Sequence, residues 1–323
     1  MFIKLVDSDR EKGGEFEKMN PMLYSTLVIL TTFLMGSSFA VGKIGLTYIS
    51  PLLLVGIRFT VAGIIMALFL LGSKKPLPKL PIDWARIVTI GLFQTTGVMG
   101  CIFLSLRTIT AGESSILTFS NPLLVVIIGT LFLKIKYQIF HWIGVIIGFI
   151  GVFITLGFHI QLSIGTVFGL GAAISWSIAT ILIKKWGGRF NIWVLTAYQM
   201  LFGGFLLLLM GITMETPKLV VNLTSVSIVM WLAIMASIIQ FAIWFYLLNQ
   251  GDPGKTSAFL FLAPFFGVLS GWVLLEEVVE WYVYAGGSLI FIGIFLVNWT
   301  FSTKGILQRG NEVESKGLGN KSL

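Results

Sequence analysis

The chain has 323 residues, of which 56% are hydrophobic and 11% charged, and its mean hydropathy is +0.94. A water-soluble domain cannot cover its surface with so few charged side chains, so the composition excludes one and predicts a chain surrounded mostly by lipid. The net charge of +8 would suit nucleic-acid binding, but cations gathered on one side of a membrane explain the same charge.

Ten apolar segments follow one another along the chain, each of roughly the 20 residues that are needed to cross a bilayer. They are Met22–Leu46, Leu52–Leu71, Trp84–Ser105, Thr110–Leu133, Ile139–Phe158, Ile164–Ile183, Ile192–Thr213, Val226–Asn249, Gly254–Leu275 and Trp281–Thr300. The loops between them are too short for a soluble domain. The sequence therefore predicts an all-α integral membrane protein with ten transmembrane helices.

The cationic side chains divide unevenly between the two sides of this arrangement. When both termini are placed inside, the outer ends of the spans hold only Lys43, Arg107 and Lys218, and nearly all other cations lie inside. The positive-inside rule then predicts a cytoplasmic N-terminal tail over residues 1–21 and a cytoplasmic C-terminal tail over residues 301–323.

The order of residues repeats within the chain. At a shift of 142 positions Pro122 falls on Pro264 and Gly144 on Gly286, and at a shift of 141 Arg58 falls on Gln199. The repeats correspond to residues 22–158 and 159–300, with five spans each. Because five is odd, the second half enters the membrane upside down. Inverted repeats are typical of transporters that open alternately to each side.

Several of these segments also resemble a known family. MGSSFAVGKIGL at 35–46 and SPLLLVGIRF at 50–59 resemble the opening of the EamA-type repeat of the drug/metabolite transporter superfamily. The proline-centred fourth and ninth spans, the glycine-rich fifth and tenth spans, and LLEE at 274–277 fit the same pattern. The resemblance implies a ten-helix carrier of small metabolites, often an exporter of amino acids. One departure is Ile135, which stands where the first repeat would have an acidic residue.

Arg58 is the most informative single residue, because an ionisable group within a span is costly and usually faces a wet cavity or a partner. It lies roughly 10 Å from the outer end of its span at 1.5 Å per residue. Its guanidinium could clamp a substrate carboxylate through paired hydrogen bonds. It could equally form a structural ion pair or bind the carbonyls of a broken helix. The sequence leaves both interpretations open.

Three other charged residues have simpler interpretations. Thr110-x-x-Glu113 is the pattern of a capping box at a helix start, which we favour over a proton relay through Glu113. Lys43 and Lys184 end the first spans of their halves, where we expect them to snorkel to the membrane surface.

Polar and aromatic residues within the spans are candidates for the wall of a substrate cavity, although contacts between helices and plain packing are common alternatives. The candidates are Ser38, Arg58, Gln94, Asn121, Trp176, Gln199, Gln240 and Trp244. Pro122 and Pro264 each remove a backbone hydrogen bond, so we expect both to kink their helices and to act as hinges.

The favoured function is a secondary transporter in a bacterial plasma membrane that exports a small metabolite such as an amino acid. A lipid or lipid-linked-sugar flippase is the alternative. A cationic-drug pump would need a membrane carboxylate, and the candidate cavity spans contain none. Enzyme motifs such as HExxH and GxSxG are missing, and the histidines, His141 and His159, are too far apart for a metal site. We therefore expect no cofactor, no metal and no nucleic acid, with substrate and lipid as partners of a monomer or homodimer.

Overall fold

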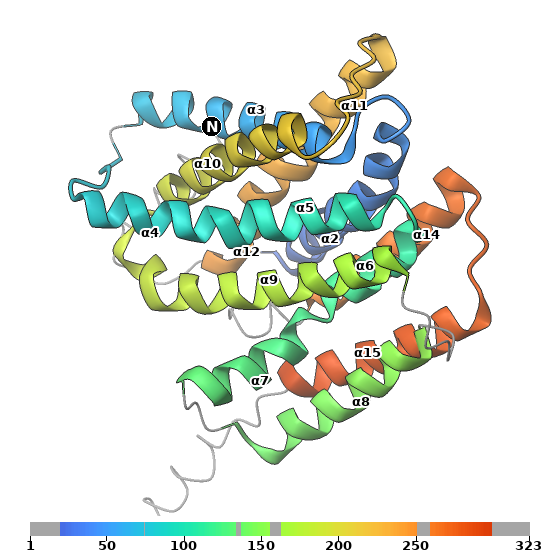
Figure 1. The fold of residues 1–323 in the computed structure, drawn as a ribbon. Coiled ribbons are helices and arrows are strands. Elements are labelled where there is room, and N and C mark those ends of the chain that lie inside the picture. Colours follow the sequence, from blue (N-terminus) through green and yellow to red (C-terminus); the bar gives the residue numbers. More distant parts are fainter. Residues whose placement is uncertain (1–19, 74, 134–136, 156–162, 251–258, 299–323) are drawn as a thin grey trace, which may run out of the picture.

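The computed structural model describes residues 20–73, 75–133, 137–155, 163–250 and 259–298, and these residues are almost entirely helical (Figure 1). Among the described residues, seven helical segments are long and apolar enough to cross a membrane, and three shorter apolar helices accompany them, at Ile139–Thr155, Leu262–Leu275 and Trp281–Val297. The predicted all-α architecture of ten apolar spans is confirmed. Most of the predicted tails and the predicted start of the ninth span at Gly254 lie outside the described residues.

The first three spans share one way of starting. Each of α2 (Pro21–Gly45), α3 (Pro51–Gly72) and α4 (Pro81–Gly91) begins with a proline. Proline at the first helical position costs no hydrogen bond, because the N–H there has no partner within the helix. These prolines therefore mark the starts of three helices.

In the second half, side-chain caps take over this role. The preceding serine or asparagine accepts a hydrogen bond from the first turn, which satisfies one of the free N–H groups there. The helices capped in this way are α9 (Ile164–Trp186), α10 (Ile192–Thr213) and α11 (Leu223–Ala233).

The third and eighth spans each contain a π-helical turn. The third runs through α4, η1 (Leu92–Gly97) and α5 (Val98–Ser105). The eighth runs through α11, η3 (Ile234–Ile239) and α12 (Gln240–Gln250). A shift of 142 positions places η1 on η3 from end to end. The internal repeat therefore includes a backbone irregularity of a kind that is frequent at functional sites.

The fourth span is broken into α6 (Ala111–Phe119) and α7 (Asn121–Leu133). Pro122 is the second residue of α7, and Pro264 is the third residue of α14 (Leu262–Leu275). Each proline thus lies in the first turn of a helix, where its missing N–H costs nothing, directly after an interruption of its span. The hinge role of both prolines stays a prediction.

The fifth and tenth spans, α8 (Ile139–Thr155) and α15 (Trp281–Asn298), run side by side in Figure 1. Their contact is as close as backbones allow. A Cβ atom built on Gly144 would lie 2.6 Å from Gly293 O, and one built on Gly151 would lie 2.6 Å from Gly286 O. Since Gly144 and Gly151 are the repeat equivalents of Gly286 and Gly293, the two contacts are related by the symmetry of the repeat.

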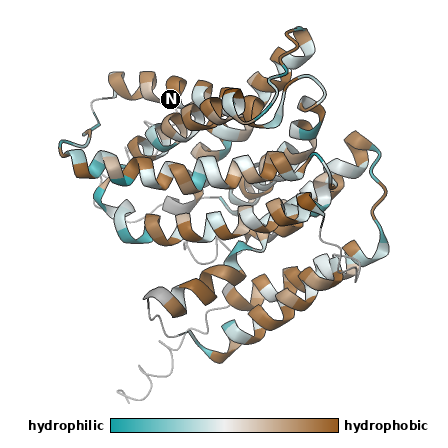
Figure 2. Ribbon diagram, viewed as in Figure 1, coloured by the Kyte–Doolittle hydropathy of each residue, from teal (hydrophilic) through white to brown (hydrophobic). Residues whose placement is uncertain are grey.

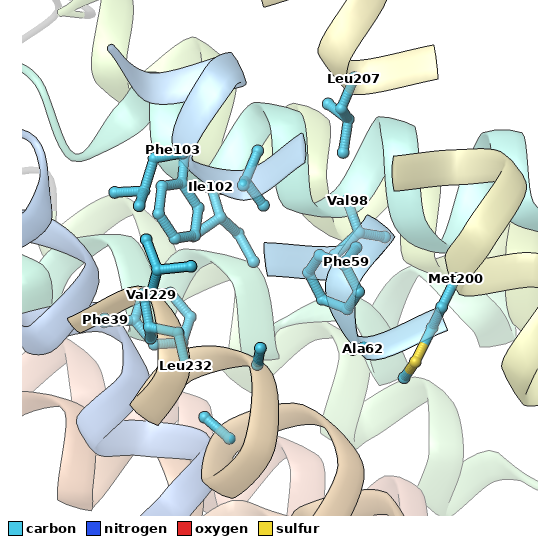
Figure 3. Packing of buried hydrophobic residues seen from close by; sticks show 14 of the residues in the cluster. Phe39, Phe59, Ala62, Val98, Ile102, Phe103, Met200, Leu207, Val229 and Leu232 are labelled. Carbon is cyan, nitrogen blue, oxygen red and sulfur yellow. The ribbon is translucent and has the colours of Figure 1, made fainter. Parts of the chain in front are cut away.

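Apolar side chains fill the space between α2, α3, α5, α10 and α11, including Phe39, Phe59, Phe103, Met200 and Leu232 (Figure 3). The outward surfaces are apolar as well, and hydrophobic residues occur along nearly all of the helices in Figure 2. Many large hydrophobic side chains there are more than half exposed, such as Leu68, Ile146, Phe153 and Phe205. Such a surface requires lipid around it.

Candidate functional site

Arg58 lies buried in the middle of this helical assembly, with 3% of its surface exposed. Its Nε donates a hydrogen bond to Ser237 Oγ at 2.9 Å, and its Nη2 donates to Ala236 O at 2.8 Å. Its guanidinium carbon is 4.7 Å from the centre of the Phe59 ring. Both acceptors belong to η3, so Arg58 joins α3 of the first half to the π-helical turn of the second.

The π-helix explains why arginine can bind there. A π-helical turn disturbs the regular ladder of backbone bonds, which leaves carbonyl groups available to side chains. Ser237 shows the same effect, since its hydroxyl donates to Leu232 O, five residues earlier, at 3.0 Å. Arg58 thus has hydrogen-bond acceptors in η3 but no counterion: no described carboxylate lies within 4.0 Å of its side-chain nitrogens.

Gln199 occupies a similar place beside the other π-helix, and is also buried at 4% exposure. Its Oε1 accepts a hydrogen bond from Thr95 Oγ1 at 2.7 Å. A second helix, α9, also binds η1, because its Ser175 Oγ donates a hydrogen bond to Phe93 O at 2.9 Å. Gln94, another cavity candidate, lies buried within the same turn.

The remaining cavity candidates are spread over three further places. Asn121 is buried at the start of α7, where its carbonyl accepts from Ser177 Oγ at 3.0 Å. Trp176 is half-buried next to Ser177 and packs edge-on against Phe119 at 5.3 Å. These contacts join α7 and α9 around the break in the fourth span.

Gln240, Ser38 and Trp244 are not gathered into one cluster by the described contacts. Gln240 is buried directly after η3, and its carbonyl accepts from Thr31 Oγ1 at 3.1 Å. The hydroxyl of Ser38 bonds within α2, to Met35 O at 2.7 Å. Trp244 is half-buried in α12.

Within the described part of the chain, two cavities lie away from all of these residues. One, of about 240 Å³, lies between α14 and α15 and is lined mainly by apolar side chains such as Phe265, Leu269 and Val283. The other, of about 620 Å³, lies at the loop between the same helices and includes Glu276. The two share Trp272 and Tyr284. None of the predicted cavity residues lines either space.

Glu113 forms a complete capping box at the start of α6. Its backbone N–H donates to Thr110 Oγ1 at 3.0 Å, and its Oε2 accepts from the Thr110 N–H at 3.0 Å. This geometry is the one that the capping interpretation requires, and it engages Oε2 of the carboxylate that a proton relay would use.

We expect Glu113→Gln to leave both the transport rate and its dependence on pH unchanged, because glutamine also completes a capping box. Thr110→Ala should instead lower the stability of the fold by about 1 kcal/mol, the usual cost of losing a helix cap. Transport rates of Glu113→Gln in proteoliposomes across a range of pH check the first expectation, and the melting temperature of Thr110→Ala checks the second. Loss of the pH dependence in Glu113→Gln would restore the relay interpretation.

Lys43, for which snorkelling stays a prediction, is bound to other parts of the chain. Its Nζ forms an ion pair with Glu277 Oε1 at 2.7 Å and donates to Ile109 O at 2.9 Å. Glu277 also accepts from the Ala111 N–H, at 2.9 Å to Oε1 and 3.0 Å to Oε2. This Lys43–Glu277 cluster ties α2 and the start of α6 to the segment after α14. Lys184, the repeat equivalent of Lys43, is exposed.

Sequence reasoning missed the cluster because Lys43 and Glu277 are 234 positions apart. The available signal was the pair of facts that Glu277 belongs to LLEE and that its equivalent in the first repeat is Ile135. That difference predicts an acidic function in one half only, but it does not name the partner.

The two halves of this helical membrane protein repeat each other, including the paired π-helices η1 and η3. Such a repeat is typical of membrane carriers built by duplication. The model of the EamA-like transporter family matches residues 22–157 and 163–299, and the chain belongs to this family. The protein is therefore a multi-pass integral membrane transporter and not an enzyme.

Individual relatives are distant but cover nearly the whole chain. The uncharacterized transporter YoaV of Bacillus subtilis is 25% identical, with 86% of this chain and 97% of that protein aligned. A probable amino-acid metabolite efflux pump of Salmonella typhimurium is 27% identical over 84% of this chain and 93% of its own length. A solved crystal structure with 21% identity shares the fold, with a TM-score of 0.61 over 84% of this chain and 95% of that one.

Proposed function

We propose that this protein is a secondary transporter that exports a small metabolite bearing a carboxylate, such as an amino acid, by alternating access. It works in a bacterial plasma membrane with both termini in the cytoplasm. The inverted repeat supports alternating access, because exchanging the conformations of the two halves moves the opening from one side to the other.

The observation that carries the proposal is the buried charge of Arg58, which has no counterion among the residues that the structure describes. Burying a cation without a counterion is costly, and in membrane proteins such groups mark substrate pathways. The described acceptors of Arg58 are neutral, a carbonyl and a hydroxyl. A substrate carboxylate would supply the missing negative charge through short charge-assisted bonds.

The positive charge of Arg58 and the bonding of two glutamates argue against a cationic-drug pump. A cationic drug would be repelled by Arg58, and Glu113 and Glu277 are engaged in a cap and in an ion pair. The name of the Salmonella relative, a probable amino-acid metabolite efflux pump, agrees with a carboxylate-bearing substrate.

The flippase remains the second candidate because of the apolar groove between α14 and α15. This space of about 240 Å³ is bordered by the exposed side chains of Phe265, Trp272 and Tyr284, so a lipid chain could enter it from the bilayer. The groove does not include Arg58, and a flippase would leave the buried charge without a role.

The test is counterflow in proteoliposomes loaded with unlabelled amino acids and exposed to a panel of radiolabelled ones. For each amino acid that exchanges, the competing compounds are the unlabelled amino acid and the amine that lacks its carboxylate. We expect saturable exchange, and at least tenfold weaker competition by the amine, since a hydrogen bond to a charged group contributes about 1.5–3 kcal/mol. Equal competition by the amine would refute carboxylate recognition. Transfer of fluorescent phospholipid between leaflets, without amino-acid exchange, would establish the flippase.

A further inference from the structure

Arg58 and Gln199 occupy equivalent positions in the two repeats, and so do the residues that they bind. A shift of 141 takes Arg58 to Gln199, and a shift of 142 takes Thr95 to Ser237. Arg58 of the first half bonds Ser237 in the second, and Gln199 of the second half bonds Thr95 in the first. Equivalent positions are thus bonded twice, each time across the boundary between the halves, with Arg58 donating to Ser237 and Gln199 accepting from Thr95.

The helices that carry Arg58 and Gln199, α3 and α10, also pack against each other through contacts that are equivalent under the repeat. A Cβ atom on Gly63 of α3 would lie 2.7 Å from Leu201 N, and one on Gly204 of α10 would lie 2.5 Å from Thr60 N. Each of these contacts is the repeat equivalent of the other, as in a two-fold interface. In this antiparallel register Gln199 is level with Ile65, seven residues from Arg58 and therefore about 10 Å along the axis.

The two arms differ in the direction of their hydrogen bonds and, more importantly, in charge. Arg58 carries a guanidinium and Gln199 a neutral amide, although both side chains are buried and both reach a π-helix. A carrier must hold its substrate whichever side is open, so a site between inverted halves sees both arms in equivalent surroundings during one cycle. A single carboxylate needs only one guanidinium.

We propose that Arg58 and Gln199 are the two equivalent arms of one central substrate site. The guanidinium that recognises the substrate carboxylate can then be placed at position 58 of the first half or at position 199 of the second. This inference rests on the proposed function. It assigns Gln199 to the substrate site and makes the charge difference between positions 58 and 199 a determinant of specificity.

The surroundings of Gln199 already contain what an arginine would need. The hydroxyl of Thr95 is the equivalent of the Ser237 hydroxyl, and the carbonyl of Gln94 is the equivalent of the Ala236 carbonyl. Because η1 and η3 coincide under the repeat, both acceptors have their counterparts in the same type of turn.

The test compares Arg58→Gln with the exchanged variant Arg58→Gln/Gln199→Arg in proteoliposomes, with a mixture of radiolabelled amino acids as the probe. We expect Arg58→Gln to lose at least tenfold in counterflow, and the exchanged variant to return to within about threefold of the wild type, because each charge-assisted interaction changes affinity about tenfold or more. The matched control is Arg58→Gln/Gln138→Arg, in which the charge is restored on the exposed Gln138 before α8. The control should stay inactive.

The possible outcomes separate the two claims. Unchanged counterflow in Arg58→Gln would refute carboxylate recognition by Arg58, and with it the basis of the inference. Lost counterflow that the exchanged variant does not recover, despite a wild-type melting temperature, would overturn the inference and leave the proposed function standing.

A second variant keeps the inference testable if the exchanged protein does not fold. Gln199→Glu has the same shape as glutamine and still accepts from Thr95, but it places a negative charge on the second arm. We expect at least a tenfold loss of amino-acid counterflow, because a carboxylate substrate would be repelled and Arg58 would gain a competing anion. The matched change Gln138→Glu should have no effect. Wild-type counterflow in Gln199→Glu would exclude Gln199 from the site.

Discussion

Glu277→Gln should lower the melting temperature of the detergent-purified protein by several degrees, whereas the neighbouring change Glu276→Gln should leave it unchanged. The side chain of Glu277 is 8% exposed and that of its partner Lys43 is 29% exposed. Glutamine keeps the shape of the side chain but removes the negative charge that Lys43 and the start of α6 share. Glu276 is exposed and takes part in no described ion pair, which makes it a matched control.

The size of the effect follows from the partial burial of the pair. Removing one partner of a fully buried ion pair costs about 3–5 kcal/mol, and exposed pairs contribute about 0–1 kcal/mol. A half-buried cluster with an additional bond to the Ala111 N–H should fall between, at about 1–3 kcal/mol. The helix dipole adds to the loss, because a carboxylate at a helix N-terminus is stabilised by it.

A double-mutant cycle with Lys43→Met measures the interaction itself. If the ion pair is the source of the stability, Lys43→Met/Glu277→Gln should be less destabilised than the sum of the two single changes, by about 1 kcal/mol or more. Strict additivity would mean that Lys43 and Glu277 act independently. The ion pair between them, at 2.7 Å, would then contribute nothing to the stability of the fold.

Gly144→Leu should be more damaging still, because it forces α8 and α15 apart. A Cβ atom at this position would lie 2.6 Å from Gly293 O and 2.9 Å from Leu296 Cβ, and the first of these is a backbone atom that cannot turn aside. Adding extra methylene groups to a packed interface usually costs about 1–3 kcal/mol, and a whole leucine side chain against a backbone atom should exceed this range, because a shift of a few tenths of an ångström cannot relieve the overlap. We expect a large drop in melting temperature and in the yield of folded protein.

The same change at other glycines provides both a control and a check on the symmetry. Gly72→Leu, at the end of α3, should be nearly neutral because no atom lies within 4 Å of the new Cβ. Gly286→Leu should cost about as much as Gly144→Leu, since the two glycines are repeat equivalents in one interface. A mild effect at Gly144 and Gly286, comparable with that at Gly72, would contradict the close packing of α8 on α15.

The sequence by itself determined the ten spans, the duplication and the class of protein. Each of these depends on local properties, because crossing a bilayer takes a run of apolar residues and a repeat is visible in residue order alone. The capping box at Glu113 was equally accessible, since Thr110 and Glu113 are neighbours on the first turn of one helix. Pro122 and Pro264 show the limit of local reasoning, because proline permits either a kink or a new helix start.

Only the tertiary structure decided which distant residues meet. Arg58 binds Ser237 across 179 positions of sequence, and Lys43 binds Glu277 across 234. Neither residue type nor spacing names such a partner, because the pairing depends on how the helices of the two halves pack. The π-helices η1 and η3 were hidden for the same reason: their hydrogen-bond acceptors are satisfied by side chains from other helices, so the turns are stable only within the assembled fold.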